Sequence, residues 1–120
     1  MTGGHMPKSN TKKGVIYTET FKLTARNLLN FLSTSVEEPK EVLNKQLDEF
    51  EKKVDVFPES CQFSPDLLEL GCDRYRECIT RDGYRILYSY DTEQEELTAH
   101  VILGKRQSVL QCLFERLIAL

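Results

Sequence analysis

Two stretches in the first half of the chain place hydrophobic residues three or four positions apart, as on one face of a helix. The first stretch predicts a helix over residues 20–34, with the apolar positions Phe21, Ala25, Leu28, Leu29 and Leu32. The second predicts a helix over residues 38–57, with the apolar positions Leu43, Leu47, Phe50, Val54 and Phe57. Pro39 suits a first helical turn, and Pro58 ends the second helix because proline cannot continue the backbone ladder.

β-Branched and aromatic residues predict four short strands. One covers residues 14–18, before the first helix. After a connector over residues 58–73, which contains several helix-breaking residues, the others cover residues 75–80, 84–90 and 97–103. Tight turns at Arg81-Asp82-Gly83 and at the acidic residues 91–96 join these three strands. We therefore expect an antiparallel meander.

The C-terminal residues complete the order of elements with a third helix. Its apolar positions are Val109, Leu110, Leu113, Phe114, Leu117 and Ile118. The resulting order, β-α-α-β-β-β-α, predicts an α+β fold in which a helical hairpin packs on one face of a small sheet dominated by antiparallel pairs. The other face of the sheet is expected to be open.

The chain has 120 residues, which is enough for one hydrophobic core. Residues 1–6, Met-Thr-Gly-Gly-His-Met, resemble the remnant of an expression tag, so we assign residues 7–120 to a single domain. No apolar run approaches the roughly 20 residues of a membrane span. We expect a cytosolic protein with no membrane partner.

The net charge of −3 is spread without a strongly basic stripe, so long-range attraction to nucleic acid is weak. Any phosphate contact must come from a local cluster. Arg76 and Arg85 lie in neighbouring predicted strands and are expected on a common face, where Lys105 and Arg106 could join them in a small cationic pocket. Alternatively, these residues are solvated, or form ion pairs with the acidic residues Asp91, Glu93, Glu95 and Glu96.

The cysteines and the strand histidine suggest structural rather than chemical roles. Cys61, Cys72, Cys78 and Cys112 contain no closely spaced pair of the kind that binds zinc, so we expect reduced, mostly buried thiols, no metal and no cofactor. His100 lies in the middle of a predicted strand and is expected to be a hydrogen-bonded core or edge residue.

The apolar C-terminal helix either folds onto the helical hairpin or is covered by a partner. We favour a partner, because a small domain with an open sheet face leaves these side chains exposed. The residues expected in this contact are Leu110, Leu113, Phe114, Leu117 and Ile118.

An ordered set of short motifs over about residues 15–115 resembles the RelE/ParE superfamily of bacterial type II toxins. The motifs are Phe57-Pro58-Glu59, Pro65-Asp66-Leu67, Tyr75-Arg76, Gly83-Tyr84-Arg85-Ile86-Leu87-Tyr88 and Val101-Ile102-Leu103-Gly104-Lys105-Arg106-Gln107. The resemblance implies a toxin, of the kind found in plasmid stabilisation systems, that a cognate antitoxin neutralises. RelE-like members cleave messenger RNA on the ribosome with a cluster of Lys and Arg and a C-terminal Tyr. ParE-like members lack the full cluster and inhibit DNA gyrase.

The resemblance carries three cations of the nuclease cluster over to Arg76, Arg85 and Arg106. The second strand Lys corresponds to Cys78, however, and the Tyr falls at or near Cys112. Because RNA cleavage needs groups that move protons and stabilise the phosphorane, these departures favour the ParE-like reading. That reading implies gyrase as the target, no catalytic residues, and target contacts through Arg76, Arg85, Lys105 and Arg106. The alternative is a RelE-like nuclease that acts on the ribosome and messenger RNA, and a third is a degenerate toxin that only binds its antitoxin.

Overall fold

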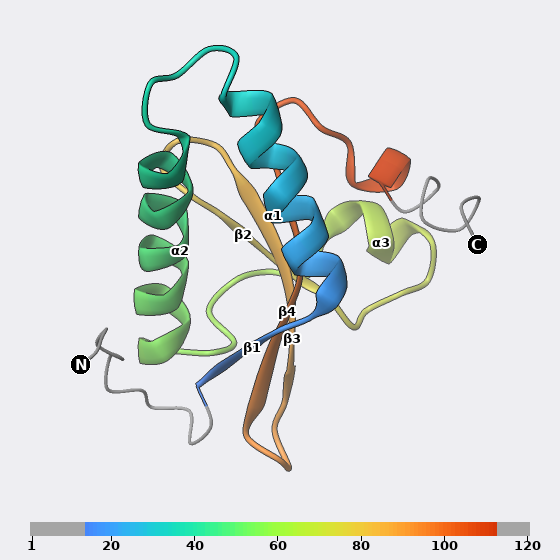
Figure 1. Cartoon of the computed structure of the whole chain (residues 1–120). Helices are drawn as coiled ribbons and strands as arrows, with labels where there is room; N and C mark the ends of the chain where they lie inside the picture. Colours follow the sequence, from blue (N-terminus) through green and yellow to red (C-terminus); the bar gives the residue numbers. More distant parts are fainter. Residues whose placement is uncertain (1–13, 113–120) are drawn as a thin grey trace.

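The computed structural model describes residues 14–112 as two helices packed against a four-stranded sheet, with a third, short helix beyond (Figure 1). In chain order the elements are β1 (Val15–Tyr17), α1 (Glu19–Leu32), α2 (Pro39–Val56), α3 (Pro65–Glu69), β2 (Arg76–Ile79), β3 (Arg85–Asp91) and β4 (Glu96–Leu103). The expected order is confirmed as far as β4, and the α+β class is confirmed. The expected connector contains the additional helix α3.

The helices begin and end where the sequence provides caps. The Thr18 hydroxyl accepts a hydrogen bond from the Phe21 backbone N–H at 3.0 Å and so caps the first turn of α1. Pro39 opens α2, where its missing N–H costs nothing. Ser64 caps α3 in the same way as Thr18 caps α1, through the Leu67 N–H at 3.4 Å.

The sheet has the strand order β1-β4-β3-β2. The pairs β2–β3 and β3–β4 are antiparallel, so the expected meander is confirmed, whereas β1 runs parallel to β4 at the other edge. The parallel pair requires a long crossover, and α1, α2 and the rest of the chain before β4 supply it. The sheet is therefore mixed.

A bulge interrupts β4 beside β3. Leu87 lies opposite Val101 and Tyr88 lies opposite Ala99, which leaves His100 as the extra residue. A bulge of this kind bends the strand and redirects the side chain of the extra residue.

The main core lies between the sheet and the helices α1 and α2. Its largest fully buried members include Tyr88, Phe50, Ile86 and Leu97, and the Phe50 and Tyr88 rings meet edge-on with centroids 5.4 Å apart. The Tyr17 hydroxyl of β1 also donates a hydrogen bond to the Glu51 carboxylate of α2. These contacts hold the helices to one face of the sheet.

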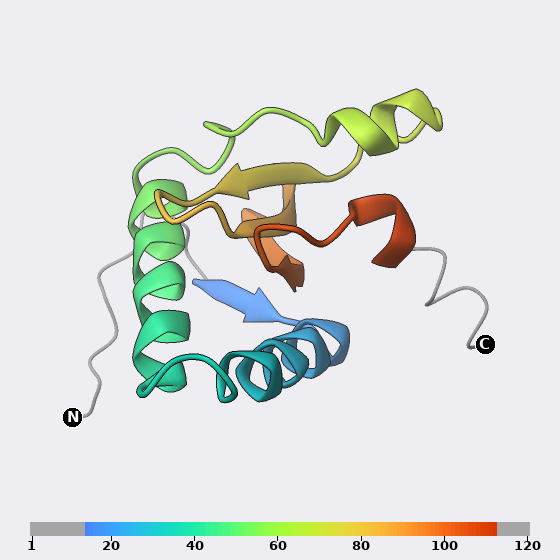
Figure 2. The ribbon, with the colours of Figure 1, turned by 90° about the horizontal axis from the view of Figure 1, so that it is seen from above.

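The second face of the sheet is not open, which corrects the expectation from the sequence. Leu87 of β3 and Leu103 of β4 point away from the main core and are covered by Leu67 of α3 and by Val109. Figure 2 shows α2 on one side of the sheet and the helical turn of residues 109–112 on the other. The second core forms because strand side chains alternate between faces, so an apolar strand such as β3 needs cover on both.

The expected C-terminal helix is present as far as the structure describes it. Residues 109–112 are helical, Val109 is 2% exposed and Leu110 is 40% exposed. Leu113, Phe114, Leu117 and Ile118 lie outside the described residues, as does the proposed tag remnant. The assignment of residues 7–120 to one domain stays a prediction.

Candidate functional site

Lys105 and Arg106 line a cavity of about 550 Å³ at the end of β4. The C-terminal half of α1 and Tyr84, which directly precedes β3, also contribute to its lining. The full set of lining residues is Asn27, Leu28, Phe31, Leu32, Tyr84, Gly104, Lys105, Arg106 and Gln107. Two of the four predicted target-binding cations are therefore brought together in a hollow.

Local backbone contacts fix the positions of these two cations. The Gln107 side-chain oxygen accepts a hydrogen bond from the Gly104 N–H at 2.7 Å and tightens the turn that holds Lys105 and Arg106. Lys105 packs over the β2–β3 turn, where a Cβ on Gly83 would lie 3.4 Å from the Lys105 Cγ. Gly83 has a φ of +93°, so glycine suits this position for its backbone as well as for its size.

The cavity combines positive charge with aromatic surface. The Phe31 ring is 70% exposed, which is unusual for a phenylalanine and leaves one apolar face available to a partner. Tyr84 is buried, and this burial, together with the Asp82 carboxylate, raises the pKa of its phenol. Tyr84 therefore stays neutral and can donate a hydrogen bond. Such a hollow suits a ligand that carries both a flat or apolar group and an anion.

Arg85 lies at the same end of the sheet but faces away from this cavity. Its register partners are Ile79 on β2 and Leu103 on β4, and the side chain of Leu103 belongs to the second core. The Arg85 guanidinium lies 3.5 Å from the carboxylate of Glu77, whose side chain is only 6% exposed. The structure therefore pairs Arg85 with a buried acid, and not with the acidic turn expected from the sequence.

Arg76 lies on the opposite face from Arg85, so the expected common face is wrong. Arg85 is opposite Ile79, an odd number of residues from Arg76, and side chains an odd number apart along a strand point to opposite faces. The Arg76 guanidinium donates to the backbone carbonyls of Cys61 at 2.6 Å and Glu59 at 3.2 Å. It also lies 4.1 Å from the centre of the Phe63 ring, so these contacts hold the loop that follows α2.

The two cysteines at the departures from the nuclease pattern occupy apolar surroundings. Cys78 is fully buried in the main core, and Cys112 is partly buried against the second core. A buried Cys78 thiol does not reach the cavity at Lys105 and Arg106, so it cannot replace a lysine there.

His100 is confirmed as a hydrogen-bonded strand residue. Its Nε2 lies 2.8 Å from the Ser89 hydroxyl, and its ring meets the Tyr75 ring edge-on with centroids 5.0 Å apart. Partial burial, and to a lesser extent the nearby Arg74 charge, lower the pKa of His100. The imidazole is therefore neutral at neutral pH.

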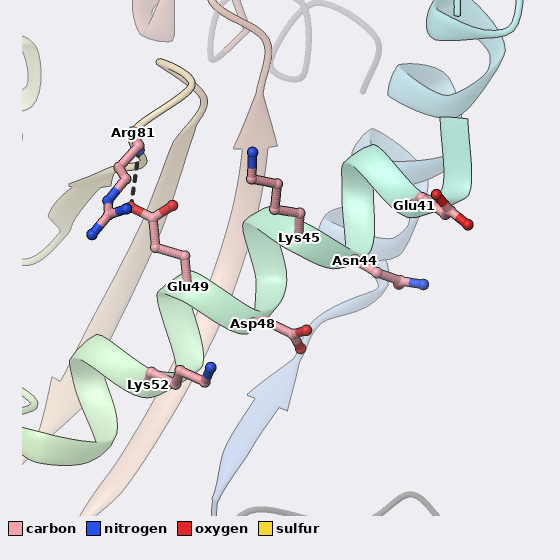
Figure 3. Close-up of a pocket in the computed structure, with 7 residues that line it drawn as sticks. All are labelled: Glu41, Asn44, Lys45, Asp48, Glu49, Lys52 and Arg81. Atoms are coloured by element: carbon pink, nitrogen blue, oxygen red, sulfur yellow. Dashed lines mark hydrogen bonds between the residues drawn. The ribbon is translucent and has the colours of Figure 1, made fainter. Parts of the chain in front are cut away.

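A second hollow follows the outer side of α2 and is shown in Figure 3. Its side chains spread apart along the helix, and two of them reach the β2–β3 turn: the Glu49 carboxylate accepts a hydrogen bond from the Arg81 backbone N–H at 2.9 Å, and the Lys45 ammonium lies 3.3 Å from the Asp82 carboxylate. The charged lining residues are Glu41, Asp48, Glu49, Lys45, Lys52 and Arg81. Because acids and bases alternate here, the hollow has no net preference for an anion or a cation.

Sequence reasoning missed the role of Gln46. Its side chain is fully buried, and its amide donates to the Val42 carbonyl at 3.1 Å and to the Asp82 carboxylate at 2.9 Å. This hydrogen bond and the nearby Lys45 lower the pKa of Asp82 and fasten the β2–β3 turn to α2. The signal was available, since Gln46 follows Leu43 by three positions and precedes Phe50 by four, as a buried helix position does.

Within residues 14–112, no group of three or more His, Cys, Asp and Glu side chains is arranged to hold a metal ion. Among the helices of this same range, none is long and apolar enough to cross a membrane.

The comparisons with known proteins identify the fold. No family model and no curated protein matches the sequence. Among solved structures, the chain is similar to the toxin–antitoxin complex RelBE2 from Mycobacterium tuberculosis, with a TM-score of 0.55, 16% identity, and coverage of 77% of this chain and 91% of that one. It is also similar to the isolated RelE toxin of E. coli, with a TM-score of 0.52, 15% identity, and coverage of 88% and 97%.

These likenesses show a RelE-like α+β fold, with two helices packed on a mixed four-stranded sheet. They agree with the superfamily resemblance of the sequence motifs. They give no support to the ParE branch over the RelE branch, because both structures are of RelE type.

Proposed function

We propose that this chain is the toxin component of a type II toxin–antitoxin pair. Two observations support this function. The fold is similar to that of the isolated RelE toxin and of the RelBE2 toxin–antitoxin complex. Independently, an ordered set of sequence motifs resembles the RelE/ParE superfamily. The described part of the chain covers the elements that form this fold.

For the activity of the toxin, the RelE-type fold favours cleavage of messenger RNA on the ribosome over inhibition of gyrase. The supporting observation in the site is the cavity that places Lys105 and Arg106 beside the exposed Phe31 ring. Single-stranded RNA is bound by stacking its bases on aromatic rings and by pairing its phosphates with cations. The proposed target-binding residues are therefore Lys105 and Arg106, and Arg85, which is paired with the buried Glu77 on the other face of the sheet, is not among them.

Gyrase inhibition is the second candidate, and one observation favours it. Arg76 is engaged by loop carbonyls and Cys78 is fully buried, so two positions of the nuclease cluster are not free to act on a phosphate. If cleavage is the activity, it proceeds with fewer cations than a full RelE cluster has. We therefore expect a slower enzyme.

Type II toxins are neutralised by a cognate antitoxin, which we expect the gene next to the toxin gene to encode. Induction of the chain in bacterial cells, with and without this neighbouring gene, tests the proposal. Growth arrest that the neighbouring gene relieves, together with new messenger RNA 5′ ends inside translated regions, is the expected result. Arg106→Gln should abolish the new ends, and Lys52→Gln, on the exposed outer side of α2, is the matched control that should not. Growth arrest with intact messenger RNA and an induced DNA-damage response would instead support inhibition of gyrase as the function.

The proposed antitoxin contact is the apolar C-terminal segment that begins at Leu110, whose side chain is 40% exposed. The residues proposed for it are Leu110, Leu113, Phe114, Leu117 and Ile118. Calorimetric titration of the antitoxin should give an affinity reduced by more than about tenfold for Leu113→Asp or Leu117→Asp, since buried apolar anchors dominate such interfaces. Leu68→Asp, at an exposed position on α3, is the control. Unchanged affinity of the first two variants would place the contact elsewhere.

A further inference from the structure

Residues 61–64, in the loop before α3, run antiparallel beside β2. Phe63 forms a bridge with Arg76. On either side of this bridge, the Ser64 N–H donates to the Tyr75 carbonyl at 2.8 Å, and the Glu77 N–H donates to the Gln62 carbonyl at 2.9 Å. The loop therefore extends the sheet by a short irregular edge next to β2.

This register places Cys61 directly opposite Cys78. Because Gln62 faces Glu77, the next residues outward along the two segments are the two cysteines. Cys61 is 7% exposed and Cys78 is fully buried, and both belong to the main core. Residues directly opposite each other in an antiparallel pair place their side chains on the same face, so both thiols lie on the side of the main core.

The spacing of such a pair suits a disulfide bond. Hydrogen-bonded and non-hydrogen-bonded pairs alternate along an antiparallel ladder, so Cys61 and Cys78 occupy a non-hydrogen-bonded position, where Cα atoms are about 4.5 Å apart. Disulfides span Cα separations of about 4.4–6.8 Å. The two thiols can therefore be joined without moving either segment by more than a small adjustment.

Neighbouring contacts hold Cys61 in this position. The Arg76 guanidinium binds the Cys61 carbonyl at 2.6 Å, and the Tyr88 hydroxyl donates to the Pro58 carbonyl at 2.8 Å. The thiol of Cys61 also lies 3.9 Å from the Ser60 hydroxyl. The loop is thus fixed on both sides of the cysteine, which reduces the entropy that would be lost when the bond closes.

The two sulfurs differ in their readiness to react. The neighbouring Cys78, Tyr88 and Ser60 side chains and the charge of Lys53 lower the pKa of the Cys61 thiol, whereas its burial opposes them. The neighbouring Cys61 side chain and burial raise the pKa of Cys78. We assign Cys61 as the nucleophile and Cys78 as the resolving thiol, because Cys61 is 7% exposed whereas Cys78 is fully buried, and an oxidant reaches the more accessible sulfur first.

We propose that Cys61 and Cys78 form a redox-active dithiol that closes into an intramolecular disulfide when the protein meets a hydroperoxide. The Cys61 thiolate attacks the peroxide oxygen and becomes a sulfenic acid, while hydrogen peroxide is reduced and leaves as water after protonation. The Cys78 sulfur then attacks the Cys61 sulfur, loses its proton, and releases the sulfenic oxygen as a second water. Two thiols and one hydrogen peroxide give one disulfide and two waters.

The disulfide would fasten the loop after α2 to β2 and close a ring of the chain that contains α3. A cross-link of this kind stabilises the folded state because it restricts the unfolded chain. This site is independent of the proposed toxin function.

Peptide mapping of the full chain after treatment with hydrogen peroxide tests the proposal. Reduced protein is treated with one equivalent of the oxidant, blocked with an alkylating reagent, and digested with trypsin and a glutamate-specific protease. Cleavage at Glu69 separates Cys61 from Cys72, so the cross-linked pair can be assigned. We expect a Cys61–Cys78 peptide as the main product, and a thermal unfolding midpoint that rises by several degrees and returns when dithiothreitol is added.

Two variants complete the experiment. Cys61→Ser should abolish both the cross-linked peptide and the reversible rise of the midpoint, and the Cys72→Ser/Cys112→Ser double variant should retain both. Because the wild-type map needs no substitution at the buried Cys78, the test does not depend on a variant that fails to fold. Cross-links that involve Cys72 or Cys112, covalent dimers, or sulfinic and sulfonic products at Cys61 without a cross-link would each overturn the proposal.

Discussion

At the scale of single residues, two arginines that look alike in the sequence have different partners. Arg76 is bound by the carbonyls of Glu59 and Cys61, and Arg85 is paired with the buried Glu77. Neither is a free surface cation. We therefore expect both to contribute to stability, and the sequence-based alternative that they are solvated cations does not hold.

Replacement of Arg76 by alanine should lower the free energy of unfolding by about 1–3 kcal/mol, because two loop carbonyls lose a charged donor. Arg74→Ala is the matched control. Arg74 precedes the same strand, is exposed and lies over the Tyr75 ring at 5.7 Å, so its loss should cost about 0.5 kcal/mol or less. Urea denaturation measures both, and equal effects would show that the loop is not held by Arg76.

Replacement of Arg85 by alanine leaves the Glu77 carboxylate buried without its cation. We expect a loss of about 1–3 kcal/mol in the free energy of unfolding, reduced from that of a fully buried pair because the Arg85 side chain is 20% exposed. The Arg85→Ala/Glu77→Gln double variant should recover part of the loss, since it removes the unpaired charge. A double variant less stable than the sum of the two single variants would contradict this account.

The lowered pKa of His100 makes stability depend on pH. Its ordinary value is 6.5, and burial beside Tyr75 and Arg74 lowers the value in the folded protein. As the pH falls, His100 therefore takes up its proton in the unfolded chain before it does so in the folded protein. The contribution of neutral His100 to the free energy of unfolding is complete above pH 6.5 and is lost as the pH falls below this value.

Unfolding by urea between pH 7.5 and pH 5, for the wild type and for His100→Gln, isolates this contribution. The difference in unfolding free energy between the two proteins should shift against the wild type as the pH falls. A difference that is constant across this range would show that His100 titrates as it does in the unfolded chain.

At the scale of elements, the sequence predicted the two long helices and all four strands, and missed only the short helix α3 among the described helices and strands. The helices expected at residues 20–34 and 38–57 are observed as Glu19–Leu32 and Pro39–Val56, because each has a long apolar stripe and a clear cap or proline. The short helix α3 was missed, because five residues are too few to show a period. Its capping serine was the available signal.

The sequence could not predict to which face of the sheet each arginine side chain points. Whether Arg76 and Arg85 share a face depends on the register of β2 and β3, and a shift of one residue reverses the answer. The turn between them leaves several registers open. The positions of Lys105 and Arg106 were easier to foresee, because they follow the last strand directly.

Because α3 covers the second core through Leu67, truncation of this side chain should destabilise the protein. Leu67→Ala should lower the free energy of unfolding by about 2–4 kcal/mol, as expected for a leucine truncated in a packed core. Leu68→Ala, on the same helix with a side chain 45% exposed, should cost less than about 1 kcal/mol. Similar small losses for both, measured by urea denaturation, would mean that α3 does not cover the sheet.

At the scale of the whole molecule, the fold separates structural arginines from available cations. Arg76 and Arg85 serve the loop and the second face, whereas Lys105 and Arg106 are exposed at the mouth of a cavity beside Phe31. Both pairs occur in motifs that the superfamily resemblance singles out. The proposed contact with a phosphate-bearing target therefore concentrates at the end of β4.

The central proposal is that this chain cleaves messenger RNA on the ribosome and contacts it through Lys105 and Arg106. The most direct measurement incubates the purified chain with ribosomes carrying a defined messenger RNA and, separately, with gyrase and relaxed plasmid. We predict cleavage of the ribosome-bound RNA, loss of cleavage in Lys105→Gln/Arg106→Gln, and unchanged supercoiling by gyrase. Intact RNA together with inhibited supercoiling would contradict the account.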